Sequence, residues 1–178
     1  MKKTILMTFM SLFVLLGCGK EATLGAHPEF THERNLYAHD FDADAIAWEF
    51  DNHEGLKVHK SANDLYLQFV HHSTLPNVQF FLDVDNDEKT GVPIERGADY
   101  MIENGWLYEA TSENKWGWKE VAQVKMHVEK DIKDTVKVPL SLLSHRSGIY
   151  KIHTQALDDT WEPKVYSPHE LGTKSTYQ

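Results

Sequence analysis

The sequence predicts an all-β protein, an antiparallel β-sandwich with at most one short helix. Apolar and polar residues alternate from about residue 35 onward, which is the period-two pattern of strands that bury one face. Gly, Asn, Asp and Pro separate the alternating runs, as tight turns require. No long stretch keeps the 3.6-residue period of a helix. Roughly eight to ten short strands of this kind fit two packed antiparallel sheets.

Strands are expected in the alternating runs, in chain order over residues 46–50, 55–60, 65–70, 78–85, 99–103, 105–111, 124–129, 136–138 and 150–156. In the run 65–70, Leu65, Leu67 and Phe69 share one face. Asn104-Gly105 lies between two of the runs and predicts a hairpin, because both residues tolerate positive φ. The short helix is expected over 139–143, where Pro139 occupies a tolerated first helical position.

The first 17 residues have the organisation of a signal peptide. A short basic start, Met1-Lys2-Lys3, precedes residues 4–16, which are almost entirely apolar. As a helix, residues 4–16 would be about 20 Å long, which is shorter than the roughly 30 Å hydrocarbon core of a bilayer. The pattern therefore predicts a signal peptide over 1–17 and no permanent span. Residues 18–34 lack periodicity and are expected to form a tether, which leaves 35–178 for the β-sandwich domain.

The apolar stretch ends in Leu15-Leu16-Gly17-Cys18, which resembles the lipobox of bacterial lipoproteins. The resemblance implies that Cys18, the only cysteine of the chain, is lipidated and becomes the mature N-terminus. The alternative is an ordinary signal peptide followed by an incidental cysteine. Gly19 follows where Asp would retain a lipoprotein, so resemblance to the Gram-negative sorting rule implies the outer membrane if the host has one. We therefore expect a cell-envelope protein whose membrane anchor is the lipid on Cys18.

Charge and cysteine content exclude several functions. The chain has 18 Lys and Arg against 27 Asp and Glu, a net charge of −9. No nucleic-acid partner is expected, because phosphate binding takes clustered Lys and Arg. Removal of residues 1–17 leaves 16 basic against 27 acidic residues, a net charge of −11, so attachment to anionic membranes depends on the lipid. A single cysteine also excludes a disulfide framework and a Cys-based zinc finger.

Four aspartates form a candidate metal site. Asp83 and Asp85 alternate along one expected strand and share a face, Asp87 follows in a turn, and Asp99 begins the next strand. Carboxylates so close together repel one another and raise each other's pKa. A hard cation relieves this repulsion, and calcium accepts oxygen ligands from irregular loops. The segment therefore predicts calcium at Asp83, Asp85 and Asp87, with Asp99 completing the site if its strand pairs alongside.

The aspartate loop is not an EF-hand. Glu88 stands where an EF-hand loop needs Gly, and Ile94 stands where it needs the bidentate Glu. The alternative to a calcium site is a solvated acidic turn, held by Asx hydrogen bonds and closed by Thr90-Gly91.

The same region carries a family resemblance. Its motifs are Asp83-Val84-Asp85-Asn86, then Thr90-Gly91, then Gly97-Ala98-Asp99-Tyr100-Met101-Ile102-Glu103. Together with the strand start at 62–67 and Val138-Pro139, they resemble the β-sandwich domains of family 9 carbohydrate-binding modules and DOMON-like domains, over most of 45–165. The resemblance implies a jelly-roll-like sandwich with a structural calcium and, in some members, a sugar or haem ligand. It carries the structural metal over to the four aspartates.

Three tryptophans form a candidate ligand-binding surface. Trp116-Gly117-Trp118 places two indoles on one side of an extended chain, and Trp106 lies on a neighbouring expected strand. Planar aromatic platforms of this kind stack on sugar rings. The alternative is that these indoles pack in the core or at its rim, because large aromatic side chains dominate core energetics.

The remaining motifs favour a binding protein over an enzyme. Eleven histidines invite a metal- or haem-binding role, but none of them form a His-x-His or His-x₃-His pair. The catalytic motifs Gly-x-Ser-x-Gly and His-Glu-x-x-His are absent from the sequence. We therefore expect a non-catalytic envelope lipoprotein that binds a glycan or another envelope ligand. The alternatives are a periplasm-facing metal or haem binder and a structural interaction domain without a small ligand.

Overall fold

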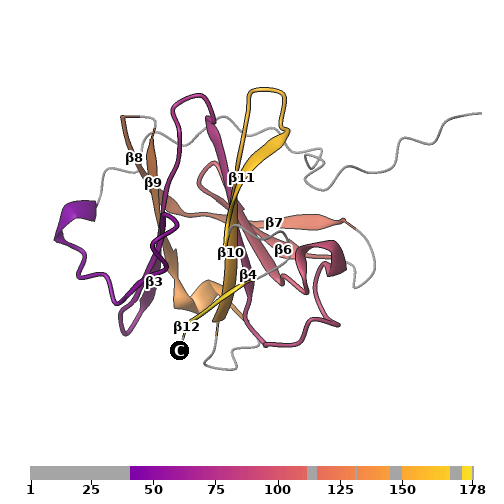
Figure 1. Ribbon diagram of the computed structural model, residues 1–178. Helices are drawn as coiled ribbons and strands as arrows, with labels where there is room; N and C mark the ends of the chain where they lie inside the picture. Colours follow the sequence, from indigo (N-terminus) through magenta and orange to yellow (C-terminus); the bar gives the residue numbers. More distant parts are fainter. Residues whose placement is uncertain (1–40, 112–115, 131, 145–149, 169–173, 178) are drawn as a thin grey trace, which may run out of the picture.

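The computed structural model describes residues 41–111, 116–130, 132–144, 150–168 and 174–177, which form two antiparallel β-sheets packed face to face (Figure 1). The first sheet has the order β1–β2–β3–β9–β8, with bounds Phe50–Asp51, Leu56–Lys60, Asp64–Val70, Lys133–Pro139 and Lys125–Glu129. The second has the order β11–β10–β4–β5–β6–β7, with bounds Pro163–Ser167, Tyr150–Leu157, Asn77–Asp83, Tyr100–Glu103, Trp106–Ala110 and Trp118–Gln123. A short strand β12, Ser175–Tyr177, also pairs with β10. The predicted all-β antiparallel sandwich is confirmed.

The helical content of the described residues is limited to single 3-10 turns, η1 (Ala43–Ala45), η2 (Pro93–Glu95) and η3 (Leu140–Leu142). The helix expected over 139–143 is η3, and Pro139 is its N-cap residue rather than its first helical residue. None of these turns is a helix long or apolar enough to cross a bilayer. The predicted signal peptide, Cys18 and the predicted tether lie outside the described residues.

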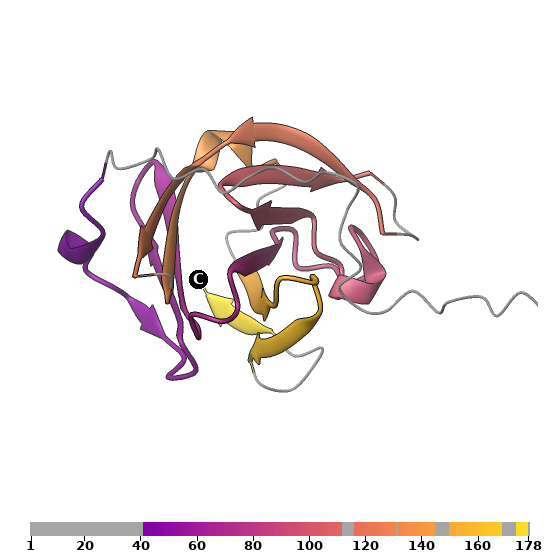
Figure 2. The ribbon, with the colours of Figure 1, turned by 90° about the horizontal axis from the view of Figure 1, so that it is seen from above.

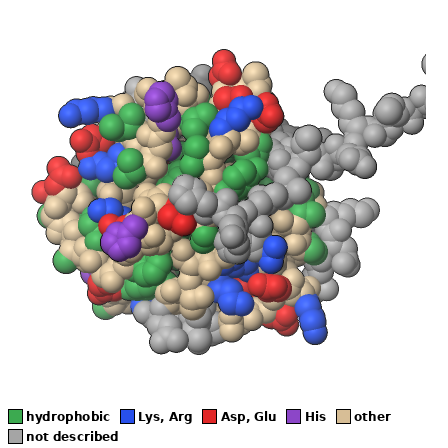
Figure 3. Space-filling model, viewed as in Figure 1, with side chains coloured by type: hydrophobic (Ala, Val, Ile, Leu, Met, Phe, Trp, Pro, Cys, Tyr) green, Lys and Arg blue, Asp and Glu red, His purple; other side chains and the backbone are tan. Residues whose placement is uncertain are grey.

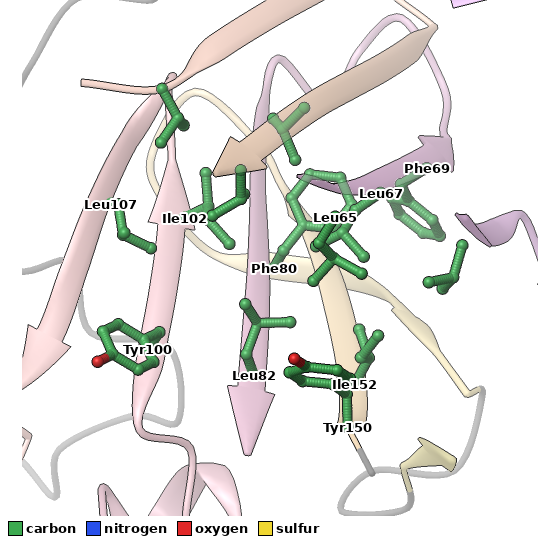
Figure 4. Packing of buried hydrophobic residues seen from close by; sticks show 14 of the residues in the cluster. Leu65, Leu67, Phe69, Phe80, Leu82, Tyr100, Ile102, Leu107, Tyr150 and Ile152 are labelled. Atoms are coloured by element: carbon green, nitrogen blue, oxygen red, sulfur yellow. The ribbon is translucent and has the colours of Figure 1, made fainter. Parts of the chain in front are cut away.

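The main hydrophobic core lies between the two sheets. Figure 4 shows side chains from β3 and β4, among them Leu67, Phe69 and Phe80, directed toward one another in this space. These side chains are buried, as are Ile102 of β5 and Ile152 of β10. Burying a side chain of this size contributes about 1.5–3 kcal/mol relative to leaving it exposed. The alternation in the sequence placed Leu65, Leu67 and Phe69 on one face of β3, and that face points into the main core.

Strand β4 is buried on both of its faces. Phe80 and Leu82 point into the main core, whereas Phe81 belongs to a second cluster on the other side of the sheet. The residues of this second cluster, called here the outer cluster, are Phe81, Val92, Ala98, Met101, Tyr108 and Trp118, with Trp106, Ala110 and Trp116 packed against them. Val92 and Ala98 come from the connection between β4 and β5, which therefore folds back over the sheet.

One long segment passes from one sheet to the other. Strand β7 pairs with β6 in the second sheet, and after Val124 the chain continues as β8, which pairs with β9 in the first sheet. Figure 2 shows this segment running along one side of the sandwich. Val124 is buried at the crossing point and contributes to the main core.

The Asn104-Gly105 hairpin is confirmed. Asn104 has φ 52° and Gly105 has φ 79°, and Glu103 pairs with Trp106 across the turn. The strand expected over 46–50 is wrong for most of its length, because the first paired residues are Phe50–Asp51. Strands β7, β11 and β12 were not among the expected runs.

Candidate metal centre and adjoining pocket

Three of the four predicted metal ligands meet at one end of the second sheet. Strand β4 ends at Asp83, and the N–H of Asp99 donates to the carbonyl of Leu82 at 2.8 Å just before β5 begins. One carboxylate oxygen from each of Asp83, Asp85 and Asp99 lies within 4.8 Å of the other two. In the part of the chain that the structure describes, no other three His, Cys, Asp or Glu side chains form such a group. We call these three residues the aspartate cluster.

Asp87, the fourth predicted ligand, is not a member of the aspartate cluster. The backbone turns sharply at Asn86, which has φ 64°, and the Asp87 side chain is exposed. One of its carboxylate oxygens accepts the N–H of Lys89 at 3.0 Å. Asp87 therefore shapes the turn instead of facing the other three carboxylates.

Each carboxylate of the aspartate cluster also has donors from the chain itself. Asp83 accepts the N–H of Asn86 at 2.7 Å on Oδ1 and the Lys174 ammonium at 2.8 Å on Oδ2. Asp85 accepts the N–H of Asp87 at 2.9 Å and the Thr90 hydroxyl at 3.0 Å. Asp99 accepts the N–H of Val84 at 2.9 Å. The Asx bonds of the alternative interpretation are thus present alongside the clustered oxygens.

The electrostatics of the cluster are unfavourable for Asp99 in particular. Burial, with a smaller contribution from the nearby charges of Asp85 and Asp83, raises the pKa of Asp99 from 3.8 to about 6 against the opposing backbone hydrogen bonds. Burial lowers the pKa of the Lys174 ammonium, although Asp83 opposes that change. Any added positive charge, whether a proton on Asp99 or a cation among the oxygens, therefore stabilises the cluster.

The loop that carries the cluster depends on a glycine. Gly91 has φ +60°, and a Cβ at this position would collide with the carbonyl group of Ala98. The close approach allows the N–H of Val92 to donate to the Ala98 carbonyl at 2.9 Å. This bridge closes the loop and holds Asp99 beside the end of β4.

A pocket of about 460 Å³ adjoins the aspartate cluster. Asp85 and Asp99 line it together with a third carboxylate, Glu109, which lies at the end of β6. Its hydroxyl-bearing lining residues are Thr90, Tyr100, Thr111 and Ser144. Carboxylates and hydroxyls in this combination can bind a cation or a ligand rich in hydroxyl groups.

Tyr100 orders the wall of the pocket opposite the loop. Its hydroxyl lies 2.6 Å from the Ser144 hydroxyl and accepts the Ser144 N–H at 2.8 Å. It also lies 3.4 Å from a carboxylate oxygen of Glu109. Glu109 and Ser144 were not predicted as site residues, and Tyr100 was named only within the Gly97–Glu103 motif. The one available signal was that Tyr100 and Glu109 lie at the ends of neighbouring strands.

Of the three tryptophans of the predicted ligand surface, Trp118 is buried, whereas Trp106 and Trp116 are half-buried. Trp118 is 5% exposed, and its ring meets that of Trp116 edge-on, with centroids 5.6 Å apart and an interplanar angle of 85°. Both rings also contact the Phe81 ring, with centroid distances of 6.2 Å for Trp116 and 6.1 Å for Trp118. Trp106 is half-buried against the same outer cluster. The geometry favours the packing interpretation for Trp118 and leaves Trp116 and Trp106 partly accessible at the margin.

The described histidines do not form a shared metal site. His153 lies 2.7 Å from a Glu95 oxygen and stacks on Phe81, and His71 lies 3.5 Å from an oxygen of Asp134. The other described histidines are His53, His59, His72 and His127. None of the six belongs to a group of three His, Cys, Asp or Glu side chains whose ligand atoms lie within 4.8 Å of one another. His27, His32, His39, His145 and His169 lie outside the described residues.

Comparison with known proteins adds no relative. No family model matches the chain, no curated protein matches its sequence, and no solved structure matches its fold. The resemblance to family 9 carbohydrate-binding modules and DOMON-like domains therefore stays a prediction from the motifs of residues 83–103.

Proposed function

We propose that this protein is a non-catalytic, lipid-anchored cell-envelope protein that binds calcium at the aspartate cluster and a hydroxyl-rich ligand, such as a glycan, in the adjoining pocket. One observation carries the proposal. Asp85 and Asp99 belong both to the aspartate cluster and to the lining of the 460 Å³ pocket. A cation held there would present its open coordination positions to whatever enters the pocket.

The chemistry of the donors suits calcium. Calcium takes six to eight oxygen ligands at roughly 2.3–2.6 Å and tolerates irregular geometry. Three carboxylates leave coordination positions for water or for ligand hydroxyls, and Glu109 and Ser144 lie across the same pocket. Softer metals prefer nitrogen and sulfur ligands, which the cluster does not offer.

The cell-envelope part of the proposal rests on Cys18. A lipid on this residue would hold the domain at a membrane, in the outer membrane if the host is Gram-negative. On the face shown in Figure 3, acidic and basic side chains are interspersed rather than gathered by sign. We expect no nucleic-acid partner, because phosphate binding takes clustered Lys and Arg. Mass spectrometry of the mature N-terminus should find acyl chains on Cys18, and an unmodified cysteine would contradict the anchor.

The binding proposal is tested with the lipoprotein purified in detergent. Calcium should raise the melting temperature by mass action, and Asp85→Asn should abolish the rise. The matched control is Asp87→Asn, which removes an equal charge from the same loop but lies outside the cluster and should keep the calcium response. An unchanged melting temperature on adding calcium or chelator to the wild type would remove calcium from the account.

The location of the ligand is tested on a glycan array in calcium. Glu109→Gln should lose glycans that the wild type binds, while Trp116→Ala should keep them. The opposite result would move the ligand to the tryptophan surface. If the wild type binds no glycan, the glycan proposal fails and a structural interaction role is favoured.

A further inference from the structure

The chain places one of its own cations on the aspartate cluster. The Lys174 ammonium donates to Asp83 Oδ2 at 2.8 Å and also to the backbone carbonyl of Arg96. The Lys174 side chain is 3% exposed and that of Asp83 is fully buried. Lys174 is 91 residues from Asp83 in sequence, so this contact joins the C-terminal segment to the loop between β4 and β5. A buried ammonium at this position is direct evidence that the cluster accepts positive charge.

We propose that Lys174 and a divalent cation compete for Asp83, so that calcium binding displaces Lys174 and loosens the C-terminal strand β12. This inference rests on the cation site proposed above and describes how that site is regulated. Removal of Lys174 should strengthen calcium binding, and calcium should weaken the attachment of β12.

Both carboxylate oxygens of Asp83 already accept a hydrogen bond. Its Oδ1 accepts the Asn86 N–H, and its Oδ2 accepts the ammonium. A cation that coordinates Oδ2 at roughly 2.4 Å would lie no more than about 5 Å from the ammonium, where like charges repel strongly in a partly buried site. The two cations therefore cannot both hold this oxygen. The bonds to Asp85 and Asp99 come from N–H groups and a hydroxyl, which leave their oxygens open to further coordination.

Exchange of Lys174 for a divalent ion changes both the hydration of the ammonium and the charge among the carboxylates. Lys174 loses hydration when it is buried against Asp83, and it regains that hydration when it is displaced. A divalent ion brings twice the charge to three carboxylates that lie within 4.8 Å of one another. The exchange therefore replaces one buried ion pair by a site with more opposite charge, and this gain is set against the partial dehydration of the divalent ion.

Lys174 directly precedes β12, whose three residues pair with Tyr150, Lys151 and Ile152 of β10. Tyr177 at the end of β12 is buried against the main core, and its hydroxyl donates to Glu49. A strand of three residues has few hydrogen bonds of its own. Loss of the Lys174 contact at its start should therefore speed amide hydrogen exchange in all three residues.

The test combines calcium titration with hydrogen exchange on the full lipoprotein in detergent. Lys174→Met should bind calcium roughly tenfold or more tightly than the wild type, as removal of a competing ligand predicts. Lys164→Met is the matched control: Lys164 also pairs with carboxylates, Asp158 and Glu162, and this variant should bind calcium as the wild type does. In the wild type, calcium should speed amide exchange in Ser175–Tyr177, a measurement that needs no variant.

Each outcome distinguishes the inference from the proposed function. Equal calcium affinity in the wild type and in Lys174→Met, with unchanged exchange in β12, would overturn the competition but leave the cation site standing. Absence of calcium binding in both proteins would overturn the cation site itself and the competition with it. Calcium binding by Lys174→Met alone would support a site that Lys174 blocks. If the Met variant does not fold, the wild-type exchange experiment decides.

Discussion

Replacement of Asp99 by Asn should stabilise the protein when no divalent cation is present. Asp99 lies half-buried beside Asp83 and Asp85, and burial together with these charges raises its pKa from 3.8 to about 6. Asn removes the charge at nearly the same size and keeps an oxygen that can accept the Val84 N–H. The variant therefore removes the unfavourable electrostatics while retaining the local hydrogen bond.

The size of the effect follows from the pKa. Below pH 3.8, Asp99 is protonated in the folded and the unfolded protein, and its charge has no effect on stability. Between pH 3.8 and about 6 only the folded protein keeps the proton, so the free energy of unfolding falls as the pH rises. The rise of about two pKa units corresponds to roughly 3 kcal/mol above pH 6. Because Asp99 is only half-buried, solvent screening should reduce this to about 1–2 kcal/mol.

The assay is thermal unfolding in chelator at pH 8 and at pH 4. Asp99→Asn should melt roughly 3–6 °C above the wild type at pH 8, and the two should melt together at pH 4. Asp87→Asn removes a carboxylate from the same loop but outside the cluster, and it should show no such difference between the two pH values. An Asp99→Asn variant that is no more stable than the wild type at pH 8, or equally stabilised at pH 4, would refute the reasoning.

Three further predictions, made with four substitutions, concern the packing of the sandwich and the ionisation of Tyr177. Gly91→Ala should lower the free energy of unfolding by about 2 kcal/mol or more, measured by denaturant titration, because alanine disfavours the positive φ and its Cβ meets the Ala98 carbonyl; an unchanged midpoint would contradict this loop geometry. Trp118→Ala should lower the free energy of unfolding by about 3–5 kcal/mol, because Trp118 is a buried aromatic residue, and Trp116→Ala should lower it distinctly less. Equal losses of stability in the two variants would contradict the difference in burial. Burial and the hydrogen bond to Glu49 raise the pKa of Tyr177 to about 12, so the free energy of unfolding falls between pH 10 and 12. Tyr177→Phe should lose less stability than the wild type over this range. An equal loss in both proteins would contradict the raised pKa.

The strands that sequence reasoning located are those that bury at least one face. In β3, Leu65, Leu67 and Phe69 alternate with Tyr66 and Gln68 because the three apolar side chains point into the main core. Strand β7 was missed because it is an edge strand whose residues 119–121 are all exposed, so no alternation marks it. Strand β12 was missed because three residues are too few to establish a period.

The candidate site was predictable where its residues are close in sequence. Asp83 and Asp85 are two residues apart at the end of a strand, and Asp99 joins them through pairing of β4 with β5. Asp87 lies outside the cluster because the positive φ of Asn86 redirects the chain, a local choice that the loop sequence did not reveal. Lys174 could not be assigned, because its contact with Asp83 depends on where the C-terminal segment docks.

The sequence by itself determined the fold class, the apolar face of β3, the Asn104-Gly105 turn and the acidic character of the loop after β4. These features follow from side-chain alternation and local backbone preferences, which act between residues near one another in the chain. The tertiary structure alone decided that Trp118 is buried, that Glu109 shares a pocket with Asp85, and that an ammonium lies on Asp83. Electrostatic and packing energies depend on distance through space and on exclusion of water, and separation along the chain specifies neither.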